Sequence, residues 1–121
     1  MRKNPARKFL YNLNFLEDKK KSLEVLDPEG EEYKLLSKAF KLYDIAYNRF
    51  SNNQKKIVEF AYKRGLTHIE AHCQGNICNS LGTYYRRKRK MEYIIERYIP
   101  GDILNKIDKT FLKDQEKNNN K

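Results

Sequence analysis

Residues 80–98, SLGTYYRRKRKMEYIIERY, decide the fold class of this chain because they combine an apolar stripe with a basic face at helical spacing. At about 100° per residue, one side of a helix would carry Leu81, Tyr84, Lys88, Met91, Ile95 and Tyr98. Ser80 precedes this stripe, and its hydroxyl can accept a hydrogen bond from an unpaired amide of the first turn. The stretch therefore predicts one long amphipathic helix that packs on a small core.

The opposite side of this predicted helix is cationic. It carries Gly82, Thr83, Arg86, Arg89, Lys90 and Arg97, with Arg87 on the flank. Such a face cannot be buried without anionic partners. A solvated basic surface is the plain alternative, but five consecutive cations beside aromatic residues favour nucleic acid. The positive N-terminal end of the helix could meet a DNA backbone or enter a major groove.

The charge of the whole chain also favours a polyanionic partner. Its 121 residues have a formal net charge of +10, and 35% of them are charged while 39% are hydrophobic. DNA, RNA and an anionic membrane surface are the candidates. Membrane is the weakest, because no apolar run approaches the roughly 20 residues that span a bilayer. The N-terminal stretch lacks the apolar segment and cleavage site of a secretory signal, so we expect a cytoplasmic protein.

Length and composition fit one small all-α protein with a modest core. Residues 1–30 are expected to form a basic arm and short helices, because Pro5 opposes a regular start and residues 9–26 have roughly helical apolar spacing. The arm, residues 1–8, would be mobile and would contact phosphates through Arg2, Lys3, Arg7 and Lys8. A turn is predicted at Asp27-Pro28-Glu29-Gly30.

Residues 31–99 are expected to form a helical core. The first helix, from about Glu31, carries a stripe made of Leu36, Ala39, Phe40, Tyr43, Ala46, Tyr47 and Phe50. Two capping-box patterns, Ser51 with Gln54 and Thr67 with Glu70, predict the starts of the next two helices. Gly65 between them is expected to end the first of these as its C′ residue.

Residues 100–121 are expected to form a C-terminal helix and a tail. Pro100-Gly101 should stop the long helix. The next helix is predicted from Ile103, Leu104, Ile107, Phe111 and Leu112, and the polar tail after it should be disordered.

The arrangement of three short helices, of which the third is cationic and preceded by a turn, is typical of a helix-turn-helix DNA-binding domain, here at about residues 67–98. The helix from His68 would brace against the DNA backbone, and the helix after Ser80 would enter the major groove.

Two registers of the turn are open. If Gly75 is the turn glycine, the helices pack through Ala71, Leu81 and Tyr84, but Gln74 and Asn76 occupy normally apolar positions. If Cys78-Asn79 makes the turn, Ser80 keeps its cap, and the buried stripe is Ile69, Cys73 and Ile77. We favour the second register, because it keeps both the cap and the stripe.

The run Ser80-Leu81-Gly82-Thr83-Tyr84-Tyr85-Arg86, followed by Arg87-Lys88-Arg89-Lys90, resembles the S-x-x-T-Y-Y-R and following basic residues of ArpU/RinA-type phage transcriptional regulators. Those proteins are similar in turn to the promoter-reading C-terminal domain of sigma factors, known as region 4. The resemblance covers roughly residues 50–98. It implies a phage or prophage activator of late genes in which Thr83, Arg86 and Lys90 face DNA and Tyr84 packs inward. The chain departs from the family pattern at Gly82 and at Cys78-Asn79.

We therefore expect a sequence-specific transcriptional regulator that binds double-stranded DNA. The candidates for base edges are Thr83, Arg86 and Lys90, beside the capping Ser80. The candidates for phosphates are Asn79, Arg87 and Arg89, with the four cations of the arm. Gly82 has two readings: it lets the helix backbone approach DNA closely, or it is a tolerated glycine that costs up to about 1 kcal/mol.

Two other functions remain open. The chain could be a small terminase-like subunit that recognises DNA for packaging, in which case it would assemble as a homo-oligomeric ring. It could instead bind RNA polymerase, as a sigma or anti-sigma factor does, with its basic helix on an acidic protein surface. Failure to bind any duplex at about 0.1 M salt, together with polymerase capture, would favour this second alternative.

Other chemistry has little support in the sequence. His68 and His72 are four residues apart and near Cys73 and Cys78, but adjacent helical side chains point in different directions, so no metal or other cofactor is expected. The two cysteines are expected to be reduced, small core residues, with both histidines at or near the surface. No glycine-rich phosphate loop and no nucleophile placed with a base are present, so we expect no enzyme. Tyr85 could stack on bases, and its role stays open.

Overall fold

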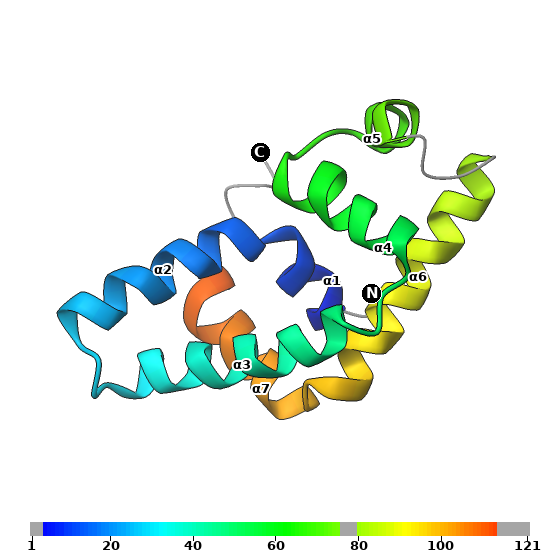
Figure 1. Cartoon of the computed structure of the whole chain (residues 1–121). Helices are drawn as coiled ribbons and strands as arrows, with labels where there is room; N and C mark the ends of the chain where they lie inside the picture. The colour runs from blue at the N-terminus through cyan, green and yellow to red at the C-terminus, as the bar shows by residue number, and fades with distance from the viewer. Residues whose placement is uncertain (1–3, 76–79, 114–121) are drawn as a thin grey trace.

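The computed structural model describes residues 4–75 and 80–113, and within these ranges the chain is all-helical, without a strand (Figure 1). The elements are α1 (Pro5–Tyr11), α2 (Leu13–Leu26), α3 (Glu31–Tyr47), α4 (Asn52–Ile57), α5 (His68–Gly75), α6 (Leu81–Tyr98) and α7 (Gly101–Ile107). Two π-helical segments, η1 (Val58–Lys63) and η2 (Asp108–Leu112), continue α4 and α7. The predicted all-α fold class is confirmed.

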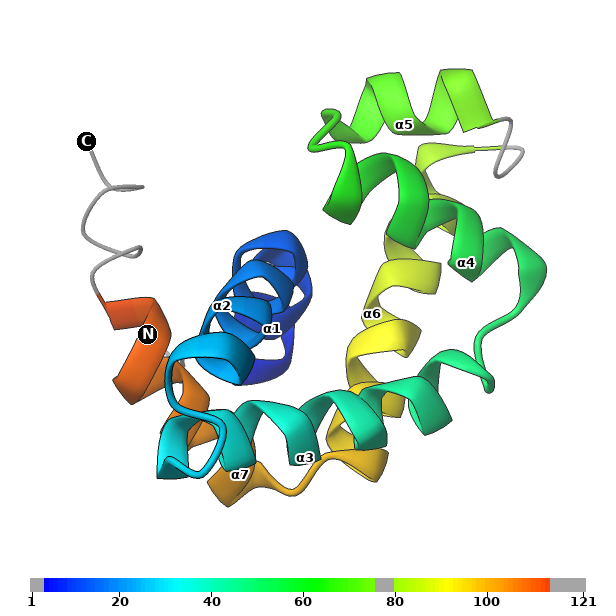
Figure 2. The ribbon, with the colours of Figure 1, turned by 60° about the vertical axis from the view of Figure 1, so that its left-hand side comes forward.

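One hydrophobic core joins the helices, and α1 supplies much of its centre. Helix α1 packs against α6, α7, η1 and η2, and its Phe9 ring lies 5.6 Å from the ring of Phe40 and 5.7 Å from that of Tyr43 on α3. Helices α2 and α3 run side by side across the predicted turn, and α3 also packs on α6 and α7 (Figure 2). Helix α6 therefore rests on both halves of the chain.

Local rules set the helix boundaries that the sequence predicts. Ser51 and Gln54 exchange both hydrogen bonds of a capping box at the start of α4, and Thr67 and Glu70 do the same before α5. Gly65 has a φ of 71°, the left-handed conformation that a glycine after a helix provides without steric cost. Three predicted helices between residues 51 and 98 are confirmed.

The mobile arm predicted for residues 1–8 is wrong from Asn4 onward. The side chain of Asn4 accepts a hydrogen bond from the Arg7 amide at 3.0 Å and caps α1. Pro5 occupies the first helical turn, where its missing N–H would have had no helical acceptor, so the proline starts the helix rather than opposing it. Ala6 is fully buried, which ties this turn to the core. Arg2 and Lys3 lie outside the described residues.

The buried side of α5 also differs from the favoured prediction. Ile69 is 62% exposed and Cys73 is exposed, whereas Ala71 and Gly75 are buried. The inner face follows i, i+3, i+4 and i+7 spacing from His68, because small or flat side chains there accommodate the ring of Tyr84. Packing through Ala71 and Tyr84 agrees with the other register, while the Ser80 cap is present as predicted. Ile77, Cys78 and Asn79 lie outside the described residues.

Candidate nucleic-acid interface

The first turn of α6 presents an exposed chain of polar groups. The Ser80 hydroxyl accepts a hydrogen bond from the Thr83 amide at 3.2 Å, and the two hydroxyl oxygens lie 3.1 Å apart. The Arg86 guanidinium donates to the Thr83 hydroxyl at 3.3 Å. Three of the predicted site residues thus form one contiguous surface at the positive end of the longest helix.

The cations that follow on α6 differ in their surroundings. Arg86, Arg89 and Lys90 are exposed, and no carboxylate in residues 4–75 and 80–113 lies within ion-pair distance of them. Arg87 is half-buried, and its backbone carbonyl accepts a hydrogen bond from Gln54 of α4 at 3.4 Å. The outer face therefore offers three cations to an anionic partner, and Arg87 lies at its border.

Gly82 lies in open space at this end of α6. Among the described residues, a Cβ added there would meet only the Ser80 hydroxyl oxygen, at 3.9 Å. The described part of the fold therefore does not require a glycine at this position, and both readings of Gly82 remain compatible with it.

The cations expected on the arm are held by the body of the molecule. Arg7 donates through Nε to Oε2 of Glu92 at 2.9 Å and through Nη2 to Oε1 at 3.2 Å, and Asn4 donates to the same carboxylate at 2.9 Å. The hydrogen bond to Glu92 raises the pKa of Arg7. Lys8 forms an ion pair with Asp108 at 3.2 Å. Neither side chain stands on a free arm as predicted, because each has an acidic partner distant in the sequence.

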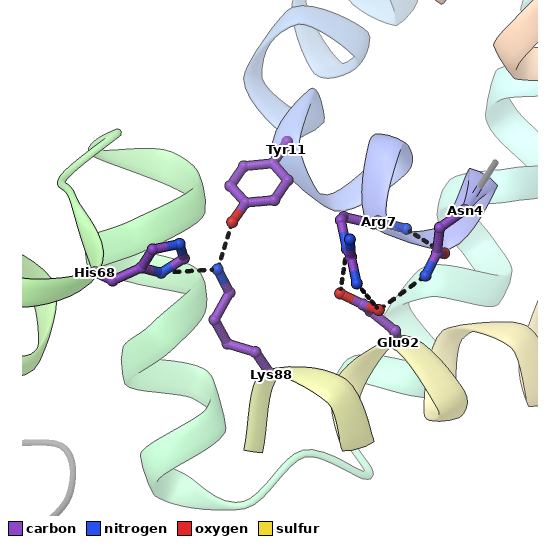
Figure 3. A network of polar contacts seen from close by, with 6 residues as sticks. All are labelled: Asn4, Arg7, Tyr11, His68, Lys88 and Glu92. Carbon is purple, nitrogen blue, oxygen red and sulfur yellow. Dashed lines mark hydrogen bonds and ion pairs between the residues drawn. The ribbon is translucent and has the colours of Figure 1, made fainter. Parts of the chain in front are cut away.

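Lys88, which the sequence places on the apolar stripe, lies at the centre of a second polar cluster (Figure 3). Its ammonium group donates a hydrogen bond to the Tyr11 hydroxyl and lies 3.1 Å from Nδ1 of His68. The rings of Tyr11, Tyr62 and Tyr84 surround it, with centroids 4.8, 5.2 and 5.8 Å from Nζ. Burial lowers the pKa of Lys88 to about 8, although the nearby Glu92 charge opposes this shift.

Sequence reasoning missed the role of Lys88 and of the residues around it. The available signal was a lysine on an otherwise apolar stripe, one helical turn before an acidic residue. Burial, and then the charge of Lys88, lower the pKa of His68. A neutral imidazole can accept a hydrogen bond through Nδ1, which is the role that the contact with Lys88 requires.

The two histidines of α5 make packing contacts with an aromatic ring of α6. The rings of His68 and His72 pack on that of Tyr84, with centroids 5.7 and 6.2 Å apart. Cys73 is exposed rather than a core residue as expected, because it lies on the outer side of α5. Within the described ranges, no group of three metal-ligating side chains could hold an ion.

Comparison of the chain with protein-family models, curated proteins and solved structures finds no match. Among the helices in the described part of the chain, none combines the length and apolar character needed to cross a membrane.

Proposed function

We propose that this protein binds double-stranded DNA through α6 and acts as a sequence-specific transcriptional regulator. The observation that carries the proposal is the exposed Ser80–Thr83–Arg86 chain, continued by Arg89 and Lys90, none of which has a carboxylate partner in the described residues. The resemblance of residues 80–90 to ArpU/RinA-type regulators supports an activator of phage late genes.

The packing around α6 suits a helix-turn-helix arrangement. Helices α4 and α5 pack on each other and on α6, and α5 lies across the region near the start of α6 (Figure 2). An α-helix fits the major groove, which is about 12 Å wide. In this arrangement α6 would enter the groove with its N-terminal turns, and the start of α5 would face the DNA backbone.

The contacts of each cation suggest different roles. Arg86 is oriented by Thr83, and a guanidinium can bind guanine O6 and N7 with two hydrogen bonds. Lys90 lies one turn further along the same face and is the second candidate for base edges. Arg89, and Arg87 at the border, are candidates for phosphates, which add affinity without sequence information.

The experiment that tests this function is a comparison of specific and non-specific duplex binding. A DNA site would first be selected with the wild-type protein from random duplexes and from DNA flanking its own gene. Arg86→Ala should weaken binding to the selected site by about 1–3 kcal/mol and weaken non-specific binding much less, as measured by fluorescence anisotropy.

Arg64→Ala is the matched control for this experiment. Arg64 is exposed but pairs with Glu59 on η1, and its loss changes the net charge equally. It should leave specific binding nearly unchanged. Equal losses on both kinds of DNA for Arg86→Ala would refute the base-reading role.

A second candidate function is binding to RNA polymerase. The observation that favours it is the tip of the α2–α3 hairpin, where Val25 is 82% and Leu26 is 80% exposed beside the acidic side chains of Glu24 and Asp27. Exposed apolar residues ringed by polar ones are typical of protein-binding surfaces. Replacing both residues by serine should abolish capture of polymerase while duplex binding persists. A molar mass well above that of a dimer in light scattering would instead favour the packaging-subunit alternative, which requires a ring.

A further inference from the structure

A cleft with a volume of about 260 Å³ lies between α1, α5 and α6. Its lining residues are Arg7, Tyr11, His68, Tyr85, Lys88, Arg89 and Glu92. It lies on a different flank of α6 from the proposed base-reading face, because Tyr85, Lys88 and Glu92 are at helical positions well away from Thr83 and Lys90. The cleft is thus a second polar feature, and of its lining residues the proposed function uses only Arg89.

The charges in the cleft do not cancel. The Glu92 carboxylate already accepts hydrogen bonds from Arg7, whose positive charge compensates it, and from the neutral amide of Asn4. Lys88 and Arg89 remain, and among the described residues neither has a carboxylate within ion-pair distance. The empty space is therefore next to an uncompensated positive charge.

The Lys88 ammonium is the deepest of these charges. Its residue is only 5% exposed, yet its hydrogen-bond contacts are both neutral, the Tyr11 hydroxyl and the His68 imidazole. An ammonium has three N–H donors, and no acceptor among the described residues takes the third. A buried charge without a contacting counter-ion is costly, so an anion at this place would stabilise the site.

We propose that this cleft binds an oxyanion, a phosphate group, on the Lys88 ammonium and the Arg89 guanidinium. The tyrosine rings around the ammonium exclude water and strengthen the attraction. The phosphate comes either from a small phosphorylated ligand or from the nucleic-acid backbone, since the start of α5 borders the cleft. The backbone source rests on the function proposed above, whereas the small-ligand source does not.

The first arm of the test is a titration of the full-length protein with inorganic phosphate, with sodium chloride at matched ionic strength as the reference. The readout is the NMR signal of the Lys88 side chain in protein with ¹³C-labelled lysine. Phosphate should shift this signal saturably and raise the pKa of Lys88, while other lysine signals follow the chloride reference.

Two variants separate the site from the fold. Lys88→Met keeps the length of the side chain without its charge and should weaken phosphate binding by about tenfold or more, measured by calorimetry. Arg89→Gln changes an exposed residue, so it should weaken phosphate binding without affecting folding. Arg97→Gln, on the same helix but outside the cleft, should leave phosphate affinity unchanged.

The second arm identifies the source of the phosphate through duplex binding. If the backbone fills the cleft, Lys88→Met lowers duplex affinity and reduces the slope of log affinity against log salt by about one. If a small ligand fills it, free phosphate saturates the cleft and the slope is unchanged. If the wild-type protein binds no duplex, the proposed function fails, and the phosphate titration alone decides this inference. The inference is overturned if phosphate shifts the Lys88 signal no more than chloride does and Lys88→Met leaves the salt slope of duplex binding unchanged.

Discussion

Lys88 and Lys90 are identical side chains two positions apart on α6, and the fold gives them opposite surroundings. Lys88 faces inward, where aromatic rings from α1, from η1 and from α6 itself enclose it together with a histidine of α5. Lys90 faces outward, without a carboxylate partner in the described ranges. One flank of the helix is therefore fixed by the rest of the chain, and the other is left available.

The two sides of α6 also differ in how far apart in the sequence their contacting residues lie. The outer chain joins Ser80, Thr83 and Arg86, which are neighbours on one helix. On the inner side, Glu92 and Lys88 contact α1 residues that are 85 and 77 positions away in the sequence. The inner contacts set the position of α6 against α1 and α5. The outer cations contribute little to the position of α6 and are available to bind a partner.

The largest effect that separates the two sides is expected for Glu92→Ala. This change removes a buried carboxylate and its bonds to Arg7 and Asn4, so the free energy of unfolding should fall by about 2–3 kcal/mol. Because the Arg7 side chain is 56% exposed, water can partly replace its lost partner. Urea denaturation followed by circular dichroism measures the loss.

Glu96→Ala is the control for this change, since Glu96 lies exposed on the same helix. It should alter the free energy of unfolding by no more than about 0.5 kcal/mol. A similar loss in both variants would mean that the inner network does not fix α6.

A smaller effect is expected in the pH dependence of stability. The pKa of Lys88 is near 8 in the folded protein and near 10.5 when unfolded, so between these values the unfolded state binds more protons. Stability from this group therefore rises with pH in that window. Between pH 7.5 and 9.5, wild type should gain about 1–2 kcal/mol of unfolding free energy relative to Lys88→Met.

The measurement is urea denaturation of both proteins across this pH range. Above about pH 10 the buried tyrosines act in the opposite sense, since burial raises the pKa of Tyr62 and of Tyr43, so the comparison must end below that pH. Parallel stability curves for the two proteins would show that Lys88 is not held in a desolvated site.

The contrast between local and distant contacts also explains how much the sequence could predict. The starts of α4, α5 and α6 were predictable because Ser51, Thr67 and Ser80 bond to residues three positions away. The exposed site on the first turn of α6 follows from the same local spacing. The starts of these three helices and the outer half of the candidate site could therefore be predicted from the sequence.

The inner half of the candidate site could not be predicted from the sequence, because the partners of its residues are remote in the sequence. No local pattern near Arg7 or Lys8 predicts that they bind Glu92 of α6 and Asp108 of η2. From the sequence alone, the basic N-terminus therefore resembles a free arm. The buried face of α5 is likewise the one whose His68 and His72 rings pack on Tyr84, and this face includes Ala71 rather than the more apolar Ile69. Hydrophobicity alone predicts the wrong side of a short helix when a large ring decides the packing.

The smallest effect on stability, expected for Gly82→Ala, tests the outer side most directly. Within residues 4–75 and 80–113, the added methyl group meets only the Ser80 hydroxyl oxygen, at 3.9 Å, so the unfolding free energy should rise by up to about 1 kcal/mol. If the backbone of α6 approaches DNA at this point, the same variant should bind the selected duplex more weakly although it is more stable. Unchanged affinity, measured by anisotropy beside the wild type, would show that Gly82 is only tolerated. Opposite changes in stability and binding would instead place the close approach to DNA at this residue, since no loss of folding could explain them.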